Sequence, residues 1–410
     1  MSFPATSHAA PEEAVRDLAA SERVRRAFRF FEERATEIDE AHARICSIPA
    51  PPFGERERAE HLRERLSERG LEGAKLDEEG NCVALRRGRA EAPPLVVSAH
   101  LDTVFPPGTD SRVRRDAAGR MRAPGIADDG CGLAALLALA GAFESCELQT
   151  QGPLLFVGTV GEEGEGDLRG VRHLLTAGEW AGRVGAFISL DGPGLERVTN
   201  AALGSRRYRV RCRGAGGHSW GDFGTPNPVH ALGRAVTRLA AYPAPRKPRT
   251  TFNVGRIEGG SGVNVIPREA SMDVDLRSES AEELARLDAF FRRAAREAAE
   301  DETAARRPGT PPLELEVKLI GDRPGGMTPP DHALVRVAAE ATRAVGVAPY
   351  FDCSSTDSNI PISLGVPAVT IGAGGTAAHT HTLEEWYDPR GRDLGLKRAL
   401  LLVLGMAGLA

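Results

Sequence analysis

The chain has 410 residues, a formal net charge of −5 and the composition of an ordinary globular protein. Its length favours two domains, and its mild acidity gives no reason to expect a nucleic acid or an anionic membrane as a partner. Six cysteines without a C-x-x-C spacing are typical of reduced thiols, so we expect a cytoplasmic protein.

The first half of the chain alternates helices with short apolar strands. Nothing near the N-terminus resembles a signal peptide, and residues 1–20 are interpreted as a loose extension. An amphipathic helix is predicted over 54–70, with two short strands within 73–87 after it. Continuous apolar strands are predicted at 94–99, 153–160 and 186–190, with an apolar helix at 131–143. Strands that are apolar throughout indicate a sheet covered on both faces, an α/β architecture.

The pattern changes between residues 203 and 321. The segment at 206–213 alternates polar and apolar residues, as a half-exposed strand does, and a helix, two strands, a long helix and a strand follow. The order βαββαβ is typical of a ferredoxin-like unit. After residue 331 the α/β pattern returns, and the apolar tail at 399–410 is too short to span a bilayer and is predicted to cap a core. We therefore predict an α/β domain from residues 1–202 and 322–410, interrupted by an α+β domain at 203–321.

Each predicted core strand is followed by residues that bind metal ions. In an open α/β sheet, ligands bind outside the carboxyl ends of the strands. The residues in question are His100, Asp102, Glu162, Glu163, Asp191, His379 and His381 after strands, and Asp128 and Asp129 before the apolar helix. One such residue alone is more often a solvated turn or a cap. So many unpaired carboxylates at one edge would strongly destabilise the fold without a cation.

The types of these residues favour zinc. Two imidazoles with several carboxylates suit zinc better than magnesium or calcium, which prefer shells of oxygen. Two Zn²⁺ ions carry four positive charges, which Asp128, Glu163, Asp191 and a bridging hydroxide would balance. Glu162 would remain as a free carboxylate beside the metal-bound water, where a general base is required.

Six motifs resemble the dinuclear-zinc exopeptidases and deacylases that include peptidase T, carboxypeptidase G, aminoacylase and succinyl-diaminopimelate desuccinylase. They are HLDTVFP, GIADDGCG, GEEGEGD, DGP, GAGGHSWGDFG and HTLEEWYDP. The resemblance runs from about residue 45 to the C-terminus. It implies a three-layer zinc-exopeptidase catalytic domain with an inserted lid or dimerisation domain, and a homodimer formed through that inserted domain.

The resemblance also implies an activity and a set of metal ligands. Aspartate at position 191 favours a peptidase T-like di- or tripeptide aminopeptidase, and an N-acyl-amino-acid deacylase or a carboxypeptidase G-like enzyme is the alternative. Two Zn²⁺ ions, or Co²⁺ or Mn²⁺ in their place, would be held by His100, Asp191, Glu163 and His381, with Asp128 bridging both ions through a cis peptide bond to Asp129. Glu162 would move the proton from the water to the leaving amine.

Other roles follow from the same resemblance. Asp102 would accept the imidazole N–H of His100 and fix its tautomer. His218 would reach across a dimer to polarise the scissile carbonyl in the other subunit, with a strand-end histidine in a turn as the alternative. The contacts to a substrate carboxylate would be Asn264 and Arg277, although Arg277 could equally be a surface charge. His381 is preferred to His379 as the ligand because it stands four residues before Glu385, and His379 would then be a loop residue or a substrate contact.

A serine hydrolase is the remote alternative. Residues 217–221, GHSWG, match the G-x-S-x-G pattern with Ser219 as the nucleophile, and Asp357 and His381 follow in triad order. The strand before this motif alternates, however, and glycine and prolines delay the helix after it, so the context of a nucleophile elbow is missing. A non-catalytic binding module is disfavoured because His100 and Glu162 are both present.

Overall fold

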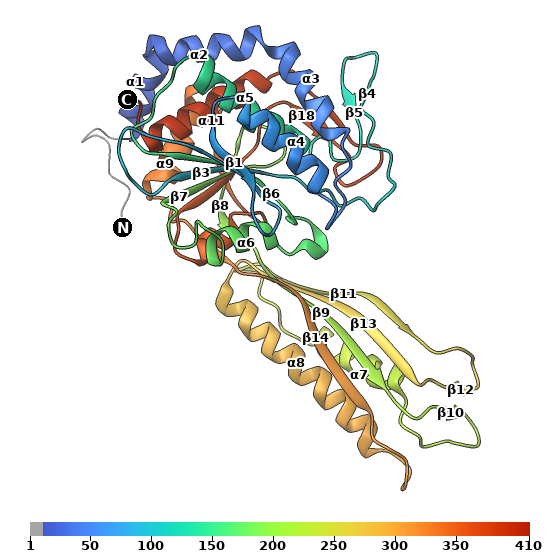
Figure 1. Cartoon of the computed structure of the whole chain (residues 1–410). Helices are drawn as coiled ribbons and strands as arrows, with labels where there is room; N and C mark the ends of the chain where they lie inside the picture. Colours follow the sequence, from blue (N-terminus) through green and yellow to red (C-terminus); the bar gives the residue numbers. More distant parts are fainter. Residues whose placement is uncertain (1–10) are drawn as a thin grey trace. The chain divides into compact units, whose positions relative to one another are not determined.

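The computed structural model describes residues 11–410, which form two compact units (Figure 1). One unit comprises the described residues up to 202 together with 327–410, and the other comprises 203–326. The first is an α/β unit on a mixed sheet and the second contains an antiparallel sheet, so the predicted fold class is confirmed. The last strand of the second unit, β14 (Glu314–Arg323), extends past residue 321, where the sequence suggested a border.

The larger unit is built on a nine-stranded sheet whose central strands are parallel. Its order is β1-β2-β6-β3-β7-β17-β8-β15, with β16 paired to β8. The central strands β3 (Leu95–His100), β6 (Leu154–Thr159), β7 (Ala186–Leu190) and β17 (Ala368–Ile371) pair in parallel and are buried along their whole length. Their carboxyl ends therefore lie at one edge of the sheet.

The remaining strands of this unit lie beside that centre or in a smaller sheet. The large sheet also contains β1 (Glu72–Leu76), β2 (Cys82–Arg86), β8 (Arg197–Ala202), β15 (Gly326–Met327) and β16 (Tyr350–Ser354). The smaller sheet consists of β4 (Arg114–Arg115), β5 (Met121–Arg122), β18 (Thr376–Ala378) and β19 (Trp386–Asp388). Strands β8 and β16 were not predicted, because their short segments carry no long apolar run.

Helices cover both faces of the large sheet. They are α1 (Pro11–Ala20), α2 (Glu22–Glu33), α3 (Ala35–Cys46), α4 (Arg56–Ser67), α5 (Gly130–Ser145), α6 (Arg169–Thr176), α9 (Ala333–Ala344), α10 (Asn359–Ser363) and α11 (Arg392–Ala407), with a 3₁₀ turn at Gly164–Gly166. Val97 and Phe156 face the core that contains α5 and α11, whereas their neighbours Val96 and Leu155 face the core under α6 and α10. This alternation is the reason why each central strand is apolar throughout.

The sequence predicted the C-terminal end of the chain better than the N-terminal end. The tail forms the buried helix α11, so the prediction that it caps a core is confirmed. The interpretation of residues 1–20 as a loose extension is wrong for 11–20, which form α1 and contact α9 and α11. Val15 of α1 is completely buried, and burial of such apolar surface holds the helix in place. Residues 1–10 lie outside the described residues.

The second unit has the predicted βαββαβ order. It consists of β9 (Gly204–Arg213), α7 (Pro228–Ala240), β11 (Thr250–Gly259), β13 (Glu269–Ser278), α8 (Ala281–Ala304) and β14, with the short ribbon β10 (Gly217–His218) and β12 (Val265–Ile266). The sheet order β11-β13-β9-β14 is antiparallel. One face packs on α7 and α8. The other carries ion pairs such as Arg209 with Asp273, 2.8 Å apart, as the alternating pattern predicts.

The core of the second unit depends on Phe291 of α8. This side chain is 1% exposed and its ring lies 5.2 Å from that of Tyr208. Replacement by alanine removes buried apolar surface and leaves a cavity, so we expect Phe291→Ala to lower the free energy of unfolding by about 3–5 kcal/mol. Urea unfolding will measure this. Phe223→Ala, at a position 82% exposed in the same unit, serves as the control and should change it by less than about 0.5 kcal/mol.

Candidate metal centre

The five predicted metal ligands come together at the carboxyl edge of the central sheet. They form two groups whose candidate ligand atoms lie within 4.8 Å of one another, namely His100, Asp128 and Asp191, and Asp128, Glu163 and His381. His100 is the last residue of β3, Asp191 follows β7 directly, and Asp128 precedes α5. The two groups share one residue, Asp128.

Asp128 has the arrangement of a bridging ligand. Its Oδ1 lies 2.8 Å from Nε2 of His100, and its Oδ2 lies 2.9 Å from Nε2 of His381. The same nitrogen of His381 lies 2.9 Å from Oε1 of Glu163. The peptide bond between Asp128 and Asp129 is cis, as expected. The two oxygens of one carboxylate therefore face two different imidazoles.

The adjacent glutamates after β6 differ in their surroundings. Glu163 belongs to the group with Asp128 and His381, whereas Glu162 groups with His100 and Glu163. Glu162 is only 5% exposed. The turn depends on Gly161, whose φ of 65° disfavours a side chain and whose added Cβ would collide with Arg169. This geometry supports Glu163 as a ligand and leaves Glu162 beside the ligand set.

Asp102 makes contacts beyond the expected one. The nitrogen Nδ1 of His100 lies 3.1 Å from the main-chain oxygen of Asp102 and 3.6 Å from its carboxylate. The carboxylate accepts hydrogen bonds from the backbone N–H groups of Glu162 and Glu163, at 2.9 and 2.8 Å. Asp102 is completely buried. Both the main chain and the carboxylate of Asp102 thus face Nδ1 of His100, and the carboxylate also holds the turn of the two glutamates.

The cluster has the electrostatics of crowded carboxylates. Burial and the nearby charge of Asp128 raise the pKa of Asp191 to about 6. Hydrogen bonds to Asp128 and Glu163 raise the pKa of His381 to about 10. Burial lowers the pKa of His100, but hydrogen bonds with Asp102 and Asp128 outweigh it and raise that pKa well above its usual value. A divalent cation in this cluster would favour the charged carboxylates and the neutral imidazoles.

Two completely buried arginines support the loops of the site, and sequence reasoning missed both. Arg58 donates to the main-chain oxygen of Leu101 at 2.7 Å, and Arg398 donates to that of Gly372. Leu101 follows the ligand His100 directly. Arg58 lies in a helix that reads as charged on most sides, so no signal in the sequence marks it as a core residue.

The predicted substrate contacts lie in the second unit, at different places. The N–H of Ser219 donates to the main-chain oxygen of Asn264 at 2.9 Å, so the loops of His218 and Asn264 are joined. Arg277 lies toward the other end of β13, opposite Ser205 of β9, and pairs with Asp275 at 2.7 Å. Their roles in substrate binding stay predictions.

His379 and Ser219 are the two alternative site residues that the sequence offered. Within residues 11–410, His379 belongs to none of the metal-candidate groups; it is exposed and its carbonyl accepts from the hydroxyl of Thr382. Ser219 follows the two-residue strand β10, and α7 begins only at Pro228. The strand–turn–helix of a nucleophile elbow is therefore not formed around Ser219.

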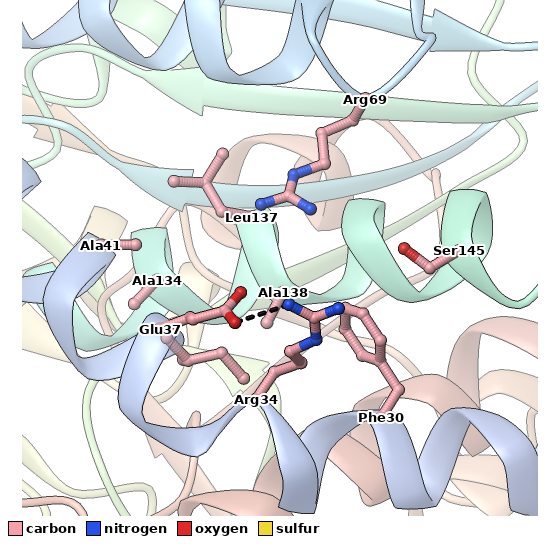
Figure 2. A pocket seen from close by; sticks show the side chains of 10 residues that line it. Phe30, Arg34, Glu37, Ala41, Arg69, Ala134, Leu137, Ala138 and Ser145 are labelled. Atoms are coloured by element: carbon pink, nitrogen blue, oxygen red, sulfur yellow. Dashed lines mark hydrogen bonds and ion pairs between the residues drawn. The ribbon is translucent and has the colours of Figure 1, made fainter.

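A separate cavity of about 260 Å³ lies among α2, α3 and α5 (Figure 2). An ion pair of 2.5 Å joins the lining residues Arg34 and Glu37, and Arg69 extends toward them from another segment. Its other lining residues are Phe30, Ile38, Ala41, Ala134, Leu137, Ala138 and Ser145. None of the five predicted ligands lines it, so this cavity is distinct from the candidate metal centre.

No helix within residues 11–410 combines the length and the apolar character needed to cross a bilayer. The six cysteines are all unpaired, five of them buried.

The α/β sheet with imidazoles and carboxylates at its carboxyl edge, together with the ferredoxin-like unit, defines a metallopeptidase-type enzyme. The chain belongs to peptidase family M20/M25/M40, whose family model matches residues 96–402. The resemblance drawn from the six motifs is therefore confirmed at the level of the family.

Three similar proteins illustrate this membership. A succinyl-diaminopimelate desuccinylase of Nitrosococcus oceani is 31% identical over 233 residues, which is 53% of this chain and 61% of that relative. The match thus spans about three fifths of the length of this curated relative. The solved aminopeptidase PepT from Bacillus cereus has a TM-score of 0.72 at 20% identity, covering 90% of this chain and 98% of that one. YXEP of Bacillus subtilis, a dinuclear metal-binding peptidase from the M20 family, has a TM-score of 0.67 at 18% identity, covering 92% and 100%.

Proposed function

We propose that this protein is a zinc-dependent hydrolase that cleaves an amide bond in a small peptide or an N-acyl amino acid. The observation that carries the proposal is the carboxylate of Asp128, whose two oxygens face His100 and His381. Three carboxylates and two imidazoles form a donor set that suits two zinc ions. The dinuclear character of the similar Bacillus subtilis peptidase supports the number of two ions.

The ligands divide between two ions. His100 and Asp191 would hold one ion, Glu163 and His381 the other, and Asp128 both. Ions bound there would polarise the amide carbonyl and acidify a water molecule. Glu162, nearly buried beside the ligand set, would accept a proton from the attacking water and return it to the leaving amine.

A homodimer would complete the site. Asn264 and His218 lie at one end of the second unit, and Arg277 lies near the other end, opposite Ser205. Ten residues of an extended strand span about 33 Å, so one small substrate cannot touch both ends of one copy. We propose that Arg277 and His218 serve a site from different subunits. The cytoplasmic location remains a prediction.

The substrate is proposed to be a di- or tripeptide with a free N-terminus. Support comes from the fold of the PepT structure and from aspartate at position 191. The identity to the desuccinylase favours an N-acyl amino acid as the second candidate. With zinc present, we expect peptides with free N-termini to be hydrolysed and their N-acetylated or N-succinylated counterparts to be left intact. Cleavage of only the blocked compounds would replace the aminopeptidase by the deacylase.

Metal removal separates this mechanism from the serine alternative. Dialysis against a chelator is expected to abolish turnover, and added Zn²⁺ or Co²⁺ should restore it, because the proposed reaction needs bound ions to polarise the carbonyl and acidify the water. Turnover measured before and after a fluorophosphonate should stay the same. Activity that survives the chelator but not the fluorophosphonate would instead point to Ser219.

A further inference from the structure

Two completely buried carboxylates beside the metal centre belong to neither ligand group. They are Asp129 and Glu385. Each is near a predicted ligand in the sequence, since Asp129 follows Asp128 and Glu385 stands four residues after His381. A buried carboxylate is costly unless its oxygens accept hydrogen bonds, and for both residues the donors are backbone N–H groups.

Glu385 joins the loop of His381 to the loop of Asp128. Its Oε1 accepts from the N–H of Ala127 at 2.7 Å and from that of Asp128 itself at 3.1 Å. Its Oε2 accepts from the N–H of Gly125 at 2.9 Å. Three hydrogen bonds from one short segment fix both the position and the direction of the Asp128 backbone.

Asp129 joins two strand ends to the first turn of α5. Its Oδ2 accepts from the N–H of His100 at 3.1 Å. Its Oδ1 accepts from the N–H of Gly192, next to Asp191, and from that of Gly132 in α5, both at 3.1 Å. One carboxylate therefore fixes the two residues that would hold the first ion relative to the bridging Asp128.

We propose that Asp129 and Glu385 are positioning residues that preorganise the metal centre. Each accepts backbone N–H groups from loops that carry metal ligands, so that the ligand atoms are in place before an ion binds. Residues that hold a metal ligand from behind typically change metal affinity by about 10–100-fold when they are removed. The inference rests on the proposed metal-dependent function.

The test compares variants by zinc affinity and stability. In Glu385→Gln an amide N–H₂ must face backbone N–H donors, and Glu385→Met removes every acceptor at similar volume. Asp129→Asn likewise replaces one acceptor oxygen of Asp129 by an amide N–H₂ group. Asp77→Asn is the matched control, because Asp77 also accepts three backbone N–H groups, those of Glu79, Gly80 and Asn81, but in a hairpin turn that carries none of the predicted ligands.

We expect Glu385→Gln and Asp129→Asn to raise the Kd for Zn²⁺, measured by equilibrium dialysis, by about 10–100-fold. The visible spectrum of the Co²⁺ form should change, KM should stay near its original value, and Asp77→Asn should bind zinc as the original protein does. If Glu385→Met does not fold, the Kd of Glu385→Gln for Zn²⁺ is sufficient to test the role of Glu385.

Two results would overturn the inference. One is an unchanged Kd in Glu385→Gln and Asp129→Asn, with only a lower melting temperature, since that is a purely structural role. The other is an equal loss of affinity in Asp77→Asn. An original protein that binds neither Zn²⁺ nor Co²⁺ would overturn the proposed function as well, whereas unchanged affinity in the variants of a zinc-binding protein overturns the inference alone.

Discussion

Glu162→Gln is expected to lower kcat by about 10²–10⁴-fold while the protein keeps its metal ions. The glutamine fills the same nearly buried space but cannot accept the proton of the attacking water. Glu162 groups with His100 and Glu163 but not with Asp128 and His381, so its loss leaves the bridged ligand set complete. Turnover and the metal content of the purified protein are the two measurements.

The neighbouring residues supply the comparison for Glu162. Glu165→Gln changes an exposed carboxylate in the same turn, and it should alter neither quantity. Glu163→Gln should instead lose metal, because Oε1 of Glu163 lies within 2.9 Å of the ligand nitrogen of His381. Loss of metal from Glu162→Gln together with retention in Glu163→Gln would mean that the two roles are reversed. Nearly normal turnover in Glu162→Gln would remove it from the mechanism.

Asp128→Asn is expected to weaken metal binding at both positions by more than about 100-fold. This loss is larger than the one expected for a residue that only holds a ligand in place. The amide can offer only one oxygen, and it carries no charge, whereas the carboxylate has an oxygen toward each histidine. Turnover should fall to that of the chelated protein. Zinc content and a Co²⁺ titration measure the effect.

The experiment must distinguish loss of a metal ligand from loss of protein stability in Asp128→Asn. Asp77→Asn again serves as the control, since it removes the same charge from a turn without ligands. If Asp128→Asn loses only one ion, Asp128 is a terminal ligand and not a bridge. If it loses neither, the cluster at the carboxyl edge is not the metal centre.

The sequence predicted the sheet and the approximate site for one physical reason. Strands buried on both faces must be apolar throughout, so their ends are visible as the points where polar residues begin. Because parallel strands share one carboxyl edge, His100, Glu163 and Asp191 could be expected near one another before any coordinates were known. The alternating pattern of 206–213 likewise predicted the half-exposed strand β9.

Sequence patterns were weaker where burial is partial or comes from another segment. Helix α1 packs against α9 and α11, but Val15 is the only one of its described side chains that is fully buried, so its apolar pattern is weak. Arg58 has the residue type of a surface position yet is 1% exposed, because each of its three guanidinium nitrogens donates to a main-chain oxygen.

By itself, the sequence determined the residue types at the strand ends, the order of the elements and the family. Only the tertiary structure decided which of these residues touch. Glu385 and Asp128 are 257 positions apart, and no periodicity links a carboxylate to a backbone N–H at that separation. The contacts of Asp102, Asp129 and Glu385 that hold the loops likewise join segments that only the folded chain brings together.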